Sequence, residues 1–292
     1  MERKNIFQRI EENYNIDDEI RKIHQLFEEK KYFYRHYNAY GRKTIEKSFT
    51  FVEMLESYIF DSWKHRGTCI SIKELLERAN AQLPSHPSFK IEEETAINYI
   101  EVILNLIKLY RDKIRVLNIQ CIDCYQDFKD VFCPLVETLK KHLGLSERII
   151  DGAIIVYPEN APLEEVLNIT PDENAQWELI RYSRETLLLA EKRKMLAYFA
   201  TAFYIESDKN DDEATKSVVE KATNILNNLH IRHNNEIGKY EKDYLKDISE
   251  DEAVSLCDLL YKQILTIVLL REQKKYDKVY KDFKDKQKGQ KP

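Results

Sequence analysis

The residues with the clearest capacity for chemistry lie late in the chain, in the run His230-Ile-Arg232-His233-Asn234-Asn235-Glu236-Ile237-Gly238-Lys239. An arginine presents a planar fork of donors that suits a phosphate, and a histidine can move a proton near neutral pH. This mixture predicts a site that binds an RNA phosphodiester, or cleaves it without a metal ion. The alternative is a polar network that caps the preceding helix and fixes the turn.

Arg232-His233, at the junction into the last helix, resembles the motif of the HEPN superfamily (higher eukaryotes and prokaryotes nucleotide-binding). In that motif an arginine and a polar residue precede a histidine. The similarity covers roughly residues 172–285 and is to abortive-infection-like members. It implies a bacterial defence protein, a helical bundle that acts as a homodimer on RNA, and a cognate antitoxin or other defence partner.

The resemblance assigns a metal-independent endoribonuclease activity to Arg232, His233 and His230. The family's histidine would fall at positions 237–239, which hold Ile, Gly and Lys here, so the motif is incomplete. A non-catalytic module for protein interaction or regulation is therefore the alternative function. Asn235 and Lys239 are expected to contact the nucleic acid.

A second octapeptide, Arg35-His36-Tyr37-Asn38-Ala39-Tyr40-Gly41-Arg42, matches the segment from Arg232 to Lys239 at its Arg, His, Asn and Gly. Chance explains a match of this length. The alternative is an internal pseudo-dimer, in which Arg35 and His36 also contact nucleic acid. The tyrosines around Arg35 can stack on bases or, as is more usual, lie at the edge of a core.

Cys121, Cys124 and Cys133 are the one cluster of metal-ligand type, with His142 as a fourth ligand if a metal binds. A C-x-x-C pair is only half of a zinc site, and cysteine in an amphipathic helix behaves as a small apolar residue. We expect a structural role, no metal and no cofactor. The chain also has no glycine-rich phosphate loop and no dinucleotide fingerprint, which argues against nucleotide-dependent enzymes.

Charge is uneven along the chain. The net charge is −5, yet the segment from Arg271 to Pro292 holds nine Lys/Arg and four Asp/Glu. This basic end is either a solvated helix end or a surface that attracts RNA. No apolar run or leader segment is evident, so the sequence predicts a cytoplasmic protein without a membrane span.

The elements that must position these residues are mostly helices, because 6 Gly and 7 Pro in 292 residues leave few breaks. Asp151-Gly152, between two β-branched runs, predicts a β-hairpin at about 147–157. We therefore expect a mainly α fold with two helical units, 1–144 and 171–292, joined by the hairpin and connector at 145–170. The apolar spacing predicts helices over 16–40 and 44–63 (an αα-hairpin), 71–82, 92–113, 118–143, 170–205, 214–230 and from 249 onward.

Overall fold

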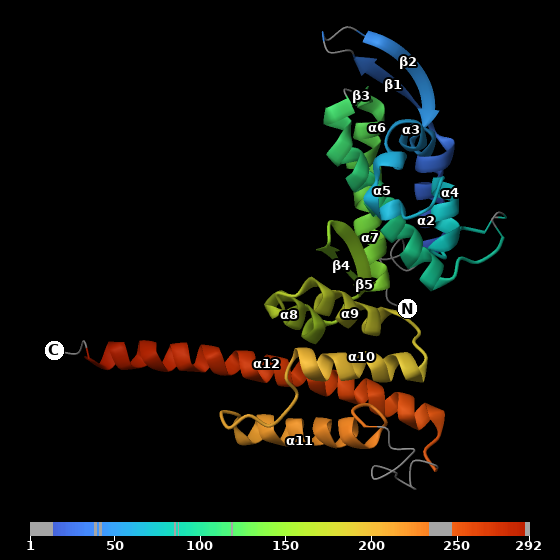
Figure 1. The fold of residues 1–292 in the computed structure, drawn as a ribbon. Coiled ribbons are helices and arrows are strands. Elements are labelled where there is room, and N and C mark those ends of the chain that lie inside the picture. The colour runs from blue at the N-terminus through green and yellow to red at the C-terminus, as the bar shows by residue number, and fades with distance from the viewer. Residues whose placement is uncertain are drawn as a thin grey trace, which may run out of the picture. The chain divides into compact units, whose positions relative to one another are not determined.

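The computed structural model describes residues 14–289 except 38–39, 41–42, 85, 87, 118 and 234–246. It divides the chain into two compact units, Met1–Pro158 and Glu159–Pro292, and each unit is described here by itself. Helices dominate both units, and a small antiparallel hairpin closes the first (Figure 1). The predicted fold class, mainly α with a small β-hairpin, is confirmed.

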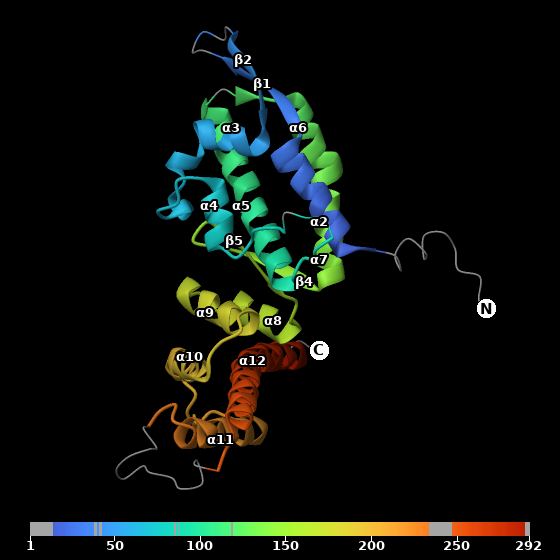
Figure 2. The ribbon, with the colours of Figure 1, turned by 90° about the vertical axis from the view of Figure 1, so that its right-hand side faces the viewer.

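The N-terminal unit combines helices with two small sheets (Figure 2). Its long helix α5 lies in the centre of the helical part. In chain order the elements are α2 (Ile16–His24), the π-helix η1 (Gln25–Glu29), β1 (Lys31–Tyr37), β2 (Lys43–Thr50), α3 (Phe51–Tyr58), the 3₁₀ turns η2 (Phe60–Ser62) and η3 (Lys64–Arg66), α4 (Ile72–Arg78), α5 (Glu93–Leu117), β3 (Ile119–Gln120), α6 (Ile122–Asp127), the π-helix η4 (Phe128–Phe132), α7 (Cys133–Leu143), β4 (Leu145–Ile150) and β5 (Ala153–Pro158).

The predicted αα-hairpin over 16–63 is wrong, because its middle forms an antiparallel β-hairpin of β1 and β2. Strand β3 pairs with the other edge of β1, which gives the order β2-β1-β3. Tyr32 and Tyr34 are buried while Phe33 and Arg35 are exposed, the alternation that a half-buried strand requires. The bulky aromatic side chains favour a strand over a helix, and Thr50 caps α3 through a reciprocal capping box with Glu53.

Aromatic rings form the centre of the N-terminal core. Phe27 packs edge-on against Phe51 at 4.9 Å between ring centroids, and Phe128 and Phe132 complete the group. The helix expected over 118–143 instead begins at Ile122 and contains the π-turn η4. Gly144 closes α7 in the left-handed conformation (φ 59°), which glycine adopts readily at the end of a helix.

The hairpin of β4 and β5 has its turn at Asp151-Gly152, where both residues have positive φ, as a type I′ turn requires. Helix α5 covers the hairpin through polar side chains. Asn105 bonds both main-chain groups of Ile154, at 2.6 and 2.8 Å, and Glu101 accepts from the Val156 N–H at 2.7 Å. These bonds satisfy the outer edge of β5, so this two-stranded sheet is stabilised by the helix beside it.

The C-terminal unit is helical throughout its described residues. The helix expected over 170–205 is two helices, separated at positions 185–188. α10 and α11 lie along the N-terminal part of α12, and α8 also contacts α12 (Figure 1). The helices are α8 (Ala161–Ile169), α9 (Glu173–Arg184), α10 (Leu189–Ala202), α11 (Glu213–Asn228) and α12 (Glu250–Gly289).

Helix α12 has a buried first half and an exposed second half. Cys257, Leu260, Ile264 and Ile267 are fully buried, whereas every residue from 275 to 287 is exposed. Within the described residues α12 is the one helix long and apolar enough to cross a membrane. Its apolar stretch packs against α8, α10 and α11, so the demands of a helical core account for that composition.

Candidate functional site

The chain reverses at the end of α11, where the predicted site begins. The Leu229 N–H donates to the Ile225 carbonyl at 3.0 Å, and the Arg232 N–H donates to the Leu226 carbonyl at 3.0 Å. Between them His230 adopts φ 54°, a conformation that non-glycine residues rarely occupy. These bonds satisfy carbonyls of the last helical turn and fix Arg232 beside α11.

The Arg232 guanidinium is directed at the connection between α10 and α11. Its Nη2 donates to the Ile205 carbonyl at 2.8 Å and lies 3.7 Å from the Glu206 carboxylate. The side chain is 23% exposed. The guanidinium is thus already bound by protein groups. These contacts favour a polar network that fixes the turn over a phosphate-binding site.

A second arginine, which the sequence did not single out, holds the same connection. Arg271 of α12 donates to the carbonyls of Tyr204 and Glu206, at 2.7 Å each, and to both oxygens of Asp211, at 2.9 and 3.2 Å. The hydrogen bond from Arg271 lowers the pKa of the buried Asp211 carboxyl. Two cations thus bind main-chain carbonyls of one loop, and we call residues 203–212 the clamped loop.

The remaining residues of the predicted site stand as follows. His230 and His233 are half-buried in the turn. Asn235 and Lys239 lie outside the described residues, as do positions 237 and 238 of the incomplete motif. The structure therefore brings Arg232 to the clamped loop.

The Arg35 segment differs from the Arg232 segment in local structure. Arg35 and His36 lie on strand β1, where Arg35 pairs in register with Glu46 and with Gln120. Arg232, by contrast, lies in a turn after a helix. The alternative of two related helical units does not fit the Arg35 octapeptide, because this segment begins on a strand. Arg35 is nevertheless exposed on the same strand face as Lys31 and Phe33.

The second half of α12 carries the densest exposed mixture of basic and aromatic side chains in the described chain. Tyr276, Val279, Tyr280 and Phe283 are 54–65% exposed and recur at the i, i+3, i+4, i+7 spacing of one helix face. Lys275, Lys284 and Lys286 flank this face, and Lys274, Lys278 and Lys281 lie on the opposite side of the helix. We call this surface the aromatic-lysine face.

The cysteines are packed in the core of the N-terminal unit. The Cys124 N–H donates to the Cys121 Sγ at 3.2 Å, and the Tyr34 hydroxyl donates to the Cys124 Sγ at 3.5 Å. Burial raises the pKa of the Cys124 thiol, which disfavours the thiolate that a metal or a nucleophile needs. His142 stacks on Tyr14, and no group of three metal-ligand side chains comes together among the residues described.

Family models, curated proteins and solved structures were each compared with this chain, and none of them matches it.

Proposed function

We propose that this protein is an RNA-binding, HEPN-like module of the abortive-infection type, and that it holds single-stranded RNA on the aromatic-lysine face of α12. The observation that carries the proposal is the exposure of Tyr276, Tyr280 and Phe283 among lysines. Aromatic side chains stack on bases, and lysines neutralise the phosphates between them. A solvated helix end would not need three exposed aromatic rings on one face.

Binding is favoured over cleavage by the contacts of Arg232. A guanidinium that stabilises the charge of a phosphoryl group must point at the substrate. The Arg232 guanidinium donates to the Ile205 carbonyl instead, and so acts on the position of the turn. We therefore place RNA binding first. The alternative is that Arg232, His233 and His230 cleave RNA without a metal ion.

The N-terminal unit offers a smaller surface of the same chemistry. Lys31, Phe33 and Arg35 point outward from β1, and Phe33 is 63% exposed. Aromatic rings combined with cations can stack the bases and neutralise the phosphates of a single strand. This surface supports the nucleic-acid contact that we expected for Arg35.

Fluorescence anisotropy with a labelled single-stranded RNA tests the proposal. Replacing both Tyr280 and Phe283 by alanine removes two stacking platforms, and should weaken binding at least tenfold at about 1–3 kcal/mol per ring. Leu259→Ala is the matched control, because Leu259 is an exposed apolar residue of the same helix, 47% exposed, outside the lysine-rich half. Equal affinity of the double variant and wild type would refute the proposal.

Salt dependence provides an independent measurement. For single strands, log Kobs falls with log salt by roughly 0.7 per neutralised phosphate. Changing Lys275, Lys284 and Lys286, which flank the aromatic rings, to glutamine should therefore reduce the slope by about 2. Cleavage is tested separately by incubating RNA with the protein in the presence of EDTA and analysing the RNA on a gel. Cleavage that is lost in Arg232→Ala would assign catalysis to the turn.

A protein partner is the second candidate function, and one observation favours it. The i, i+3, i+4, i+7 spacing of the aromatic-lysine face is also the pattern of a helix that docks into a groove or against a second copy. Light scattering after size exclusion tests the homodimer. If wild type is a dimer that dissociates in the Tyr280 and Phe283 double variant, and neither protein binds RNA, the face binds a second copy of this chain and not RNA.

A further inference from the structure

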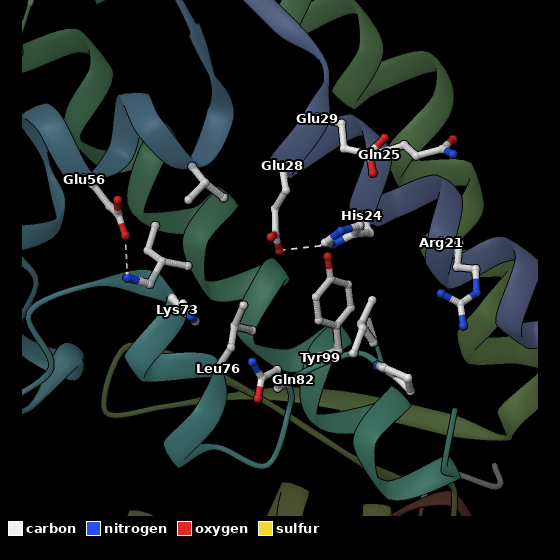
Figure 3. Close-up of a pocket in the computed structure, with 14 residues that line it drawn as sticks. Arg21, His24, Gln25, Glu28, Glu29, Glu56, Lys73, Leu76, Gln82 and Tyr99 are labelled. Atoms are coloured by element: carbon white, nitrogen blue, oxygen red, sulfur yellow. Dashed lines mark hydrogen bonds and ion pairs between the residues drawn. The ribbon is translucent and has the colours of Figure 1, made fainter. Parts of the chain in front are cut away.

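The N-terminal unit contains a cavity of about 450 Å³ that none of the functions above uses. Its lining comes from α2, η1, α3, α4, the loop at 82–84 and α5 (Figure 3). This volume lies within the range of small-molecule sites. Its polar and charged lining includes Arg21, His24, Glu28, Glu56, Lys73 and Tyr99.

One wall of the cavity is a π-helical turn that carries a histidine–glutamate pair. The Lys30 N–H donates to the Gln25 carbonyl at 2.8 Å, the i→i+5 bond that defines a π-turn. The Glu28 Oε1 lies 3.2 Å from the His24 Nδ1, and this interaction raises the pKa of His24. π-helical turns are rare and are frequently found at functional sites. Here the turn directs the Glu28 carboxylate toward His24 at the cavity.

The floor of the cavity is Tyr99, from α5. Its side chain is 0% exposed, and its hydroxyl has no hydrogen-bond partner among the described residues. Figure 3 shows that hydroxyl directed at the His24–Glu28 pair, and the two rings lie 6.5 Å apart between centroids. More than nine in ten buried polar groups have a partner, so an unpaired buried hydroxyl needs an explanation. A bound molecule with a hydrogen-bond acceptor would supply it.

The charges of the lining limit what that molecule can be. Three carboxylates, of Glu28, Glu29 and Glu56, line the cavity together with Arg21, Lys73 and His24, whose pKa is raised by Glu28. One of these cations, Arg21, already donates to the Phe89 carbonyl at 3.0 Å. The lining therefore has no excess of positive charge that would hold a nucleotide or another multiply charged anion, whereas its carboxylates can pair with a single ammonium group.

We propose that this cavity binds a small organic amine that also carries a hydroxyl or carbonyl oxygen. The ammonium group pairs with Glu28, and the oxygen accepts a hydrogen bond from Tyr99. This site belongs to the N-terminal unit and is independent of RNA binding by α12. Failure of either proposal leaves the other unchanged.

Isothermal titration calorimetry with two matched probes tests the site. Tyramine carries a phenol oxygen and an ammonium group, while 4-hydroxyphenylacetate carries the same phenol with a carboxylate. Tyramine should bind with a Kd below about 1 mM, an affinity that a single ammonium–carboxylate pair and a hydrogen bond support. The carboxylate probe should bind at least tenfold more weakly. Absence of tyramine binding, or equal binding of both probes, would overturn the proposal.

Two conservative variants assign the contacts. Tyr99→Phe and Glu28→Gln keep the shape of the cavity, and each should weaken tyramine binding about tenfold, the effect of one lost polar contact. Tyr110→Phe is the control for the first, since it removes a buried hydroxyl from the same helix outside the cavity. Glu77→Gln, an exposed position of α4 outside the lining, is the control for the second. Unchanged affinity in both test variants would refute the assignment.

Discussion

Tyr99→Phe should stabilise the ligand-free protein, which is unusual for a change in a core. The Tyr99 side chain is 0% exposed and its hydroxyl has no partner among the described residues. A buried unpaired polar group costs about 1–3 kcal/mol, and phenylalanine fills the same space without it. The expected gain is therefore about 1 kcal/mol in the free energy of unfolding, or roughly 2–4 °C in Tm for a unit of this size.

Urea denaturation followed by circular dichroism measures this change. Tyr32→Phe is the control, because the Tyr32 hydroxyl donates to the Asp127 carboxylate at 2.8 Å. Removing that bond should lower the stability by about 1–2 kcal/mol. If Tyr99→Phe destabilises the protein as Tyr32→Phe does, the Tyr99 hydroxyl is satisfied in solution, and the argument for an acceptor in the cavity fails.

Further predictions concern the clamped loop and the histidine pair. Arg271→Ala removes the cation that pairs with the buried Asp211 carboxylate, and should lower the free energy of unfolding, measured in urea, by about 2–4 kcal/mol. Arg232→Ala should lower it by about 1–2 kcal/mol. Adding Asp211→Asn to Arg271→Ala should recover part of this stability. If nothing is recovered, the loss comes only from the contacts of Arg271 with the Tyr204 and Glu206 carbonyls. The His24 pKa is raised by Glu28, so this pair stabilises the fold below the ordinary histidine pKa of about 6.5 and ceases to do so as pH rises through the raised value. The Tm difference between wild type and Glu28→Gln should thus be larger at pH 6 than at pH 9, and a difference independent of pH would contradict the pairing.

The parts of the fold that the sequence predicted correctly are those set by local chemistry. Asp151-Gly152 specifies its turn through the positive φ of both residues. Gly144 likewise ends its helix in the left-handed conformation. At the start of the helix expected from 249 onward, Ser249 accepts from the Glu252 N–H, and the Glu252 carboxylate accepts from the Ser249 N–H, the reciprocal bonds of a Ser-x-x-Glu capping box. Such signals act within four residues, so no knowledge of the tertiary structure is needed.

The incorrect predictions arose where two periodicities compete. Over 31–35 the aromatic residues fit a helix stripe, but burial alternates strictly from residue to residue, as in a strand. Tertiary pairing with β2 and β3 decides in favour of the strand, and neither partner is visible from the segment itself. The helix expected over 170–205 failed in a similar way, since a break at 185–188 contains neither glycine nor proline.

The predicted site shows the same limit. Arg232 stood out for its neighbours in sequence, yet its partner is Ile205, 27 positions earlier. The lining of the cavity comes from several elements between positions 21 and 99, and only the i, i+4 spacing of His24 and Glu28 could have suggested it. A histidine and a glutamate four residues apart are common on helices, so this spacing alone does not indicate a binding site.

The clamped loop also bears on how the C-terminal unit opens. The loop leads into α11, Arg232 follows α11, and Arg271 reaches the loop from α12. Fraying at either end of α11 must therefore break a charged hydrogen bond to the loop. Amide protons of α11 and of residues 203–212 should then exchange with solvent as one cooperative group, whereas the amides of 275–287 exchange through independent local fraying. The unit thus contains a single folding element that is discontinuous in sequence, held together by two arginine side chains.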